Sequence, residues 1–405
     1  MPSLPPEGDP APVDGVLPPS ALGTLGLRPL AFYVHVPYCS TRCGYCDFNT
    51  YTAQDLGPGV GRAAYADQAI AEVRMARRIL GDRDLPVSSV FVGGGTPTLL
   101  PPGDLGRILG AIRAEFGLEP GAEVTTEANP DSVSAQSLAA LREEGFTRIS
   151  FGLQSTAPHV LAVLDRTHTP GRAISAVAEA REVGFAHVNV DLIYASPGET
   201  ERDFAGSLEA AVTSGADHVS AYALIVEDGT RLAARIKRGD LPDVDDDIAA
   251  DRYLQAESAL GAAGFQWYEV SNWARLGGEC QHNLSYWRGD DWWGVGPGAH
   301  AHVGGVRWWN VRHPTAYAER IEAGASPAQG RELLSAEARR VEDIMLRVRL
   351  REGLELTALS DSAIAVAERA VGEGLAEPGA FAGGRLVLTL RGRLLADALV
   401  RDLVD

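Results

Sequence analysis

Three cysteines lie close together in the stretch Cys39-Ser-Thr-Arg-Cys43-Gly-Tyr-Cys46, where the spacing is C-x3-C-x2-C. A loop this short can bring three thiolates to one metal centre, and Gly44 relieves the backbone where a side chain would crowd it. Three ligands on a four-iron cluster leave one iron open, and an open position is typical of a catalytic metal site. The alternatives are a structural zinc site completed by Cys280 or a histidine, and, more weakly, a disulfide. Zinc sites usually contain paired C-x2–4-C units, so the spacing favours the cluster.

Polar or flexible residues follow four further apolar, β-rich runs. They are Gly93-Gly94-Gly95-Thr96, Glu127, Gln154 and Asp191. A loop of glycines lets backbone groups approach a ligand closely, and Thr96 adds a hydroxyl. The carboxylates of Glu127 and Asp191 can accept hydrogen bonds from ribose hydroxyls or an amine. The alternatives stay open, because the glycine run also fits a tight turn and the two carboxylates fit solvated strand ends.

The elements that must position these residues alternate between strands and helices. The expected strands are Phe32–Val36, Ser89–Val92, Glu123–Glu127, Arg148–Leu153, Val188–Ile193 and His218–Ile225. The expected helices are Tyr65–Leu80, Asp104–Phe116, Ala135–Glu144, Arg172–Val183, Glu201–Thr213 and Asp246–Ala263. This alternation predicts an α/β fold, in which parallel strands and right-handed crossovers form an open sheet or a partial barrel. Ligands gather at the carboxyl ends of such strands, so one shared site is expected there.

The composition describes an acidic globular protein. At 405 residues with 45% hydrophobic content, the chain can form one large α/β domain and a smaller one. The net charge of −18 argues against nucleic acid as a partner, because phosphate binding relies on clustered Lys and Arg. Only four cysteines occur and three share one loop, which disfavours a secreted disulfide framework.

The first 26 residues are rich in proline, and we expect them to form a disordered tail. They lack the positively charged and apolar regions of a signal peptide. No run in the sequence approaches the ~18 consecutive apolar residues that a membrane span needs. We therefore expect a cytoplasmic protein.

A histidine and large aromatic residues gather downstream, in His282-Asn283-Leu-Ser-Tyr286-Trp287. An imidazole beside Cys280 and several aromatic rings could ligate iron axially and cover a flat macrocycle. The alternative is a packed aromatic core in which the histidine is simply hydrogen-bonded. His300 and His302, in a glycine-rich turn, are further candidates for a metal or propionate contact, without an assigned role.

These motifs together resemble the radical S-adenosylmethionine superfamily. Within it, they are similar to the group that contains oxygen-independent coproporphyrinogen III dehydrogenase and the HemW-type heme chaperone. The resemblance covers about residues 30–400 and includes Tyr33-x-His35-x-Pro37, Gly93-Gly-Gly-Thr-Pro-Thr, Glu127-x-Asn129-Pro130 and Asp191-Leu-Ile-Tyr. It implies a partial (β/α)6 barrel over residues 27–265, an H-N-x-x-Y-W segment over 266–315, and a winged-helix-like α+β domain over 316–405.

The resemblance also implies cofactors and their ligands. Cys39, Cys43 and Cys46 would hold a [4Fe–4S] cluster, whose open iron is chelated by S-adenosylmethionine. The positions that match contacts to this cofactor are Tyr33, Tyr45, Gly94, Gly95, Thr96, Glu127, Gln154, Arg166, Asp191 and Ile225. The positions that match the heme-associated signature are His282, Asn283, Tyr286 and Trp287. The implied chemistry is one-electron reduction of the sulfonium, which yields methionine and a 5′-deoxyadenosyl radical.

Two features favour the chaperone type within this group. The dehydrogenase has a further cysteine two residues after the position of Cys46, where this chain has Phe48, and the H-N-x-x-Y-W signature marks the chaperone. We therefore expect heme as bound cargo, acceptor proteins that receive it, including membrane-bound ones, and an electron donor for the cluster. The alternative is the dehydrogenase itself, which oxidatively decarboxylates coproporphyrinogen III in porphyrin biosynthesis. A zinc-stabilised structural or DNA-binding protein is the alternative of another class.

Overall fold

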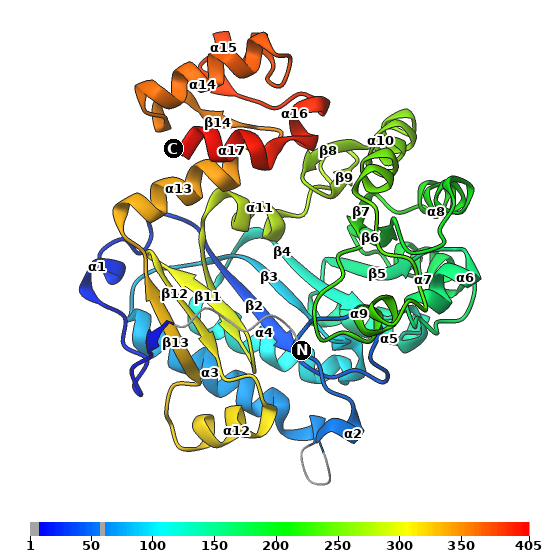
Figure 1. Cartoon of the computed structure of the whole chain (residues 1–405). Coiled ribbons are helices and arrows are strands. Elements are labelled where there is room, and N and C mark those ends of the chain that lie inside the picture. Colours follow the sequence, from blue (N-terminus) through cyan, green and yellow to red (C-terminus); the bar gives the residue numbers. More distant parts are fainter. Residues whose placement is uncertain (1–7, 57–60, 405) are drawn as a thin grey trace.

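A large curved sheet forms the centre of the protein (Figure 1). The structure is a computed structural model that describes residues 8–56 and 61–404. Within these residues, thirteen strands pair in the order β1-β13-β12-β11-β10-β2-β3-β4-β5-β6-β7-β9-β8. The six strands from β2 to β7 are parallel neighbours: β2 (Leu30–Val36), β3 (Val87–Gly94), β4 (Leu118–Ala128), β5 (Arg148–Gln154), β6 (His187–Tyr194) and β7 (His218–Ala223).

The major helices connect these strands and pack against their neighbours. They are α3 (Tyr65–Leu80), α4 (Pro102–Phe116), α5 (Ala135–Glu144), α7 (Arg172–Glu182), α8 (Glu201–Thr213) and α10 (Asp246–Ala262). Shorter helices α2 (Ala53–Leu56), α6 (Pro158–Val163) and α9 (Arg231–Lys237) lie in the loops. In the part of the chain that the structure describes, no helix combines the length and apolar character needed to cross a membrane.

The predicted alternation of six strands and six helices is confirmed, with ends that differ by only a few residues. Strand β5 is buried along its whole length, as expected for a strand covered on both faces. Helices α5 and α8 begin where their sequences supply a capping box, at Ser134 and Thr200. The α/β fold with parallel strands could therefore be predicted from local patterns.

Strand β10 (Asp291–Val295) adds a parallel neighbour that the sequence did not reveal. It pairs with β2, so β2 has partners on both sides. Beyond it, β11 (His300–Val303), β12 (Val306–Asn310) and β13 (Ala328–Leu333) continue the sheet, while β9 (Asn272–Ala274) and β8 (Gln266–Glu269) extend its other edge. Backbone pairing in the sheet crosses both of the predicted divisions, at residues 265 and 316, which stay predictions.

The prediction of a disordered tail over residues 1–26 is wrong for residues 8–26, while residues 1–7 lie outside the described chain. Strand β1 (Asp9–Pro10) pairs with β13, and α1 (Pro19–Leu22) follows. The side chains of Leu17 and Ala21 are buried in the main hydrophobic core. Proline is compatible with such an edge strand, which leaves part of its backbone unpaired, and the few apolar residues are sufficient to anchor the segment.

The last part of the chain forms a small domain with its own core, called here the end domain (Figure 1). It contains α13 (Ala336–Arg347), α14 (Asp361–Gly372), α15 (Pro378–Ala382), α16 (Leu390–Leu394), α17 (Ala396–Val404), and the paired strands β14 (Leu354–Glu355) and β15 (Arg385–Leu386). Its α+β composition agrees with the expectation, and its likeness to a winged helix stays a prediction. The sequence over residues 392–403 also suits one continuous helix, but the structure interrupts it at Leu395, which separates α16 from α17.

Ion pairs join the end domain to the rest of the protein. They are Arg393–Glu257, Arg288–Glu352, Arg307–Glu342 and Arg351–Glu279. Apolar contacts cross this junction as well: Leu350 packs with Tyr268 and Leu284, and Leu390 packs against the main core. We refer to this junction as the domain seam.

A buried carboxylate holds helix α3 to the extension of the sheet. Glu72 accepts hydrogen bonds from the backbone N–H of Gly296 at 2.8 Å, from Asn310 Nδ2 at 2.8 Å and from the Tyr317 hydroxyl at 2.5 Å. Burial raises the pKa of Glu72 to about 7, although these three donors oppose the shift. The folded protein therefore favours protonated Glu72 more strongly than the unfolded chain does.

We predict that Glu72 makes stability depend on pH. Because its pKa is raised on folding, its contribution is fully present below the unfolded pKa and is lost as pH rises through about 7. The difference in melting temperature between Glu72→Gln and wild type should therefore shift in favour of the variant between about pH 5 and pH 8. Thermal melts across this range measure it, with Glu143→Gln on the exposed face of α5 as the control. Parallel curves for wild type and Glu72→Gln would refute the prediction.

Candidate functional site

The cysteine loop begins where strand β2 ends and is fixed by backbone hydrogen bonds. The N–H of Cys39 donates to the Tyr51 carbonyl at 3.0 Å, and the N–H of Gly44 donates to the Leu164 carbonyl at 3.0 Å. Arg166 Nη1 lies 3.5 Å from Cys43 Sγ. Burial raises the pKa of Cys39 to about 11, and a bound metal would reverse this by stabilising the thiolate.

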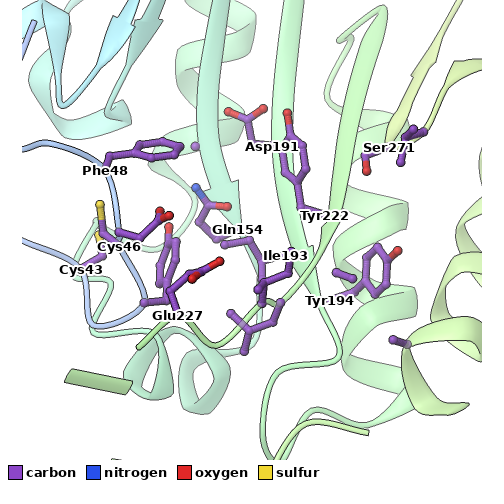
Figure 2. Close-up of a pocket in the computed structure, with 18 of the residues that line it drawn as sticks. Cys43, Cys46, Phe48, Gln154, Asp191, Ile193, Tyr194, Tyr222, Glu227 and Ser271 are labelled. Carbon is purple, nitrogen blue, oxygen red and sulfur yellow. The ribbon is translucent and has the colours of Figure 1, made fainter. Parts of the chain in front are cut away.

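All three cysteines line one cavity of about 1090 Å³ (Figure 2). Figure 2 shows Cys43, Cys46 and Phe48 on one side of this space, and Tyr222 and Ser271 on the other. Nine of the ten positions predicted to contact S-adenosylmethionine also line it: Tyr45, Gly94, Gly95, Thr96, Glu127, Gln154, Arg166, Asp191 and Ile225. The prediction that the strand ends converge on a shared site agrees with this lining, whereas Tyr33 faces a second cavity.

The glycine run after β3 is required by close packing within the chain itself. A Cβ on Gly95 would lie 2.5 Å from the Tyr38 carbonyl oxygen, and one on Gly93 would lie 2.9 Å from Glu127 Oε2. Gly94 has a φ of 108°, which side-chain-bearing residues rarely adopt. The loop therefore lies tightly against both the cysteine loop and strand β4, and the tight-turn interpretation accounts for part of its sequence.

Two half-buried carboxyl groups form the wall beside this loop. Glu127 Oε2 accepts a hydrogen bond from the Gly94 N–H at 3.0 Å, and burial together with Asp191 raises its pKa to about 8. Asp191 accepts from Ser150 Oγ at 2.9 Å and from Asn189 Nδ2 at 2.7 Å, and burial also raises its pKa. These side chains are not solvated strand ends, so that alternative is excluded for both.

Two polar groups in the cavity wall have unused hydrogen-bonding capacity. Among the described residues, Gln154 Oε1 and Arg166 Nε are buried without a hydrogen-bond partner. Gln154 also has a φ of 62°, an uncommon value for a residue with a side chain. An unpaired buried polar atom costs about 1–3 kcal/mol, so a polar ligand that supplies a partner would be favoured here.

The donor set fits an iron–sulfur cluster next to a polar organic cofactor. Within the described chain, no three His, Cys, Asp or Glu side chains stand at the spacing of ligands around a single metal ion. A four-iron cluster is larger than one ion and separates its thiolates further, so the three cysteines on one cavity wall suit it better. Cys280 is buried beside the second cavity instead, and it does not complete a zinc site with the loop.

The second cavity is small, about 200 Å³, and contains most of the H-N-x-x-Y-W signature. His282 is buried, with Nδ1 2.9 Å from Ser89 Oγ and Nε2 2.9 Å from the Tyr286 hydroxyl. Burial lowers its pKa to about 3, so the imidazole is neutral. Asn283 lines the same cavity, whereas Trp287 packs against the cluster around Tyr268.

The prediction that this signature binds heme stays a prediction. The structure shows what iron coordination by His282 would require. Both ring nitrogens of His282 are hydrogen-bonded, so one bond must break before His282 can coordinate iron. His300 and His302 lie on β11 and line neither cavity. His302 Nδ1 lies 3.3 Å from the Asp290 carbonyl oxygen, which is consistent with a structural contact.

Sequence reasoning missed a buried ion pair that positions helix α11 (Gln281–Arg288), which carries this signature. Glu123 Oε1 accepts a hydrogen bond from the His282 N–H at 3.1 Å and lies 3.3 Å from Cys280 Sγ. Glu123 Oε2 lies 3.3 Å from Arg148 Nη1, and both side chains are almost fully buried. Glu123 lies at the start of an expected strand. A single charged residue at such a position was the one sequence feature that could have indicated a buried ion pair.

Comparisons with known proteins agree with this geometry. A family model described as the radical SAM superfamily matches residues 33–211. The chain is 53% identical over 378 residues to the heme chaperone HemW of Mycobacterium tuberculosis, covering 93% of this chain and 95% of that protein. It is 33% identical over 325 residues to the heme chaperone HemW of Bacillus subtilis, covering 80% and 84%. The solved structure of coproporphyrinogen III oxidase (HemN) from Escherichia coli matches with a TM-score of 0.79 at 23% identity, covering 95% and 92%. This last likeness concerns the fold alone.

We predict that Arg148→Ala destabilises the protein by roughly 3–5 kcal/mol, because it leaves the Glu123 charge buried without its cation. Urea unfolding measures the change. Arg202→Ala, on exposed α8, is the control and should alter stability little. Equal stability of the two variants would show that Arg148 does not hold this region together.

Proposed function

Because the chain belongs to the HemW heme chaperone family of the radical S-adenosylmethionine superfamily, we propose that it binds heme and transfers it to acceptor proteins. The observation that supports this most directly is 53% identity to a heme chaperone over nearly the whole length of both chains. Heme, acceptor proteins that include membrane-bound ones, an electron donor and a cytoplasmic location are parts of this proposal.

We propose that the inner part of the large cavity holds the two cofactors typical of this superfamily. Cys39, Cys43 and Cys46 would hold a [4Fe–4S] cluster, and the walls around Gly94, Glu127, Gln154 and Asp191 would bind S-adenosylmethionine. Together these groups supply one-electron cleavage of the sulfonium when bound. The protein's own part is to bind, orient and shield them: Gln154 Oε1 offers a free acceptor, and Glu127, with its pKa of about 8, is largely neutral at pH 7.

Conversion of coproporphyrinogen III is the second candidate, but no contact in the structure favours it. The likeness to HemN is at 23% identity and concerns the fold, and the chain has Phe48 where that enzyme type has another cysteine. Phe48 is 57% exposed and lines the cavity mouth beside Cys46. An apolar ring at this position suits contact with an apolar cargo.

We predict that anaerobically purified protein contains about four iron and four sulfide ions per chain. Cys39→Ala, Cys43→Ala and Cys46→Ala should each lose most of this iron. Cys280→Ala is the matched control and should retain it, because Cys280 lies outside the cysteine loop. Colourless wild-type protein with stoichiometric zinc would overturn the cluster and revive the zinc alternative.

We predict that the wild-type protein develops a Soret band on titration with hemin. If His282 supplies the axial ligand, His282→Ala should shift the Soret maximum and weaken binding, while exposed His159→Ala should not. Ser89→Ala removes a hydrogen bond to His282 but keeps the imidazole. It therefore distinguishes the loss of an iron ligand from a disturbance of the structure around His282.

Two outcomes would contradict the proposal. Wild-type protein without a Soret response would remove the heme-binding function. Formation of protoporphyrinogen IX from coproporphyrinogen III, in an anaerobic assay with reductant and S-adenosylmethionine, would assign the dehydrogenase activity instead.

A further inference from the structure

The large cavity extends beyond the residues assigned to the two proposed cofactors. Cavities that hold one small ligand typically measure roughly 300–1,000 Å³, and this one measures about 1090 Å³ with the cofactor-binding residues on only part of its wall. The lining continues to α10, to the turn between β8 and β9, and to the end domain. Part of the cavity wall is therefore left for a further ligand beside the cofactors.

The additional wall is unusually apolar for a surface open to water. The structure describes fourteen exposed large hydrophobic side chains, and six of them line this cavity: Phe48, Tyr222, Ile225, Val270, Leu394 and Leu395. Ile225 is 69% exposed, and Leu394 and Leu395 are at least 40% exposed. Exposed apolar side chains that gather in one cavity mark a binding site for an apolar partner.

The break between helices α16 and α17 brings two of these side chains, Leu394 and Leu395, to the cavity wall. Leu394 ends α16, and Leu395 has φ −113° and ψ 17°, outside the helical geometry. An uninterrupted helix would rotate successive residues by about 100°, which separates their directions. At the break, both leucines line the cavity.

The same wall carries a cation that is available to an anion. Arg401, on α17, lines the cavity and has no hydrogen bond or ion pair within residues 8–56 and 61–404. The neighbouring Arg349 is paired with Asp397 at 2.5 Å, which neutralises that carboxylate, and Arg393 is paired with Glu257. Two further acidic residues line the cavity near this wall, and neither belongs to the end domain: Asp246 lies on α10, and Glu227 lies in the loop after β7.

We propose that the heme macrocycle binds at this wall, between the barrel and the end domain, with a propionate on Arg401. We call the site the cargo seat and define it by Val270, Leu394, Leu395 and Arg401. Heme is a flat apolar ring with carboxylates at one edge, so it requires apolar side chains beside a cation. The inference rests on the proposed heme-binding function and adds a place for the ring that the H-N-x-x-Y-W signature does not provide.

The second cavity cannot serve as this seat in the structure as it stands. Its volume is about 200 Å³, below the roughly 300 Å³ at which ligand cavities typically begin. Its walls are also charged or polar, with Glu127, Arg148, Asp191 and His218 among them. If the heme macrocycle binds in the cargo seat, its binding does not depend on the second cavity, in which His282 lies.

Hemin titration of seat variants tests the proposal. The double variant Leu394→Asp/Leu395→Asp should weaken hemin binding by at least about tenfold, since one lost apolar contact of this size is worth ~1.4 kcal/mol or more. Arg401→Ala should weaken hemin binding by about tenfold and should leave hemin dimethyl ester unaffected, because the ester carries no propionate charge. Leu276→Asp and Arg369→Ala are matched controls, since both residues are exposed and lie outside the cavity.

The outcomes separate the seat from the function. All the substituted seat residues are exposed, so thermal melts should show folded variants. If wild type and both seat variants bind hemin equally, the cargo seat is refuted while the proposed function stands. Equal weakening of hemin and its dimethyl ester by Arg401→Ala would refute the propionate contact. If wild type itself does not bind hemin, the proposed function fails and the seat with it.

Discussion

The parallel pairing of successive strands is the constraint on which the rest of the structure depends. Parallel strands need crossovers that return to the same end of the sheet, so the loops after β2, β3, β4, β5 and β6 open on one edge. This arrangement brings residues separated by more than 150 positions, from Cys39 to Asp191, into one cavity wall. The topology of the sheet therefore determines which positions of the chain can line the site.

Most of this could be predicted from sequence because the relevant signals are local. Near-continuous apolar runs predict buried parallel strands, and strand ends predict where polar residues collect. The cysteines, the glycine run and the carboxylates near the ends of β4 and β6 were therefore identified correctly as neighbours. Tyr33 is the exception, because side chains alternate between the two faces of a strand and a one-residue offset decides which cavity a residue meets.

The remaining features depend on contacts between distant segments. Strand β10 is short and rich in tryptophan, so nothing local reveals that it pairs with β2. The H-N-x-x-Y-W signature suggested an accessible ligand, yet His282 is buried by the Glu123–Arg148 pair and its own hydrogen bonds. Helical periodicity continued through Leu395, and only the packing of the end domain breaks the helix there. These departures from local rules occur at the second cavity and the outer wall of the large cavity, where function is expected to override them.

The domain seam makes the width of the large cavity sensitive to ionic strength. Each domain has a separate apolar core, which dissolved ions affect little, whereas the seam also contains partly exposed ion pairs such as Arg288–Glu352 and Arg307–Glu342. Ions at physiological concentration screen exposed charges over a Debye length of about 8 Å, and more salt shortens it. Rising salt therefore weakens the ion pairs of the seam more than either apolar core, so ionic strength acts on the junction beside the outer wall of the cavity before it acts on the sheet that holds the cysteine loop.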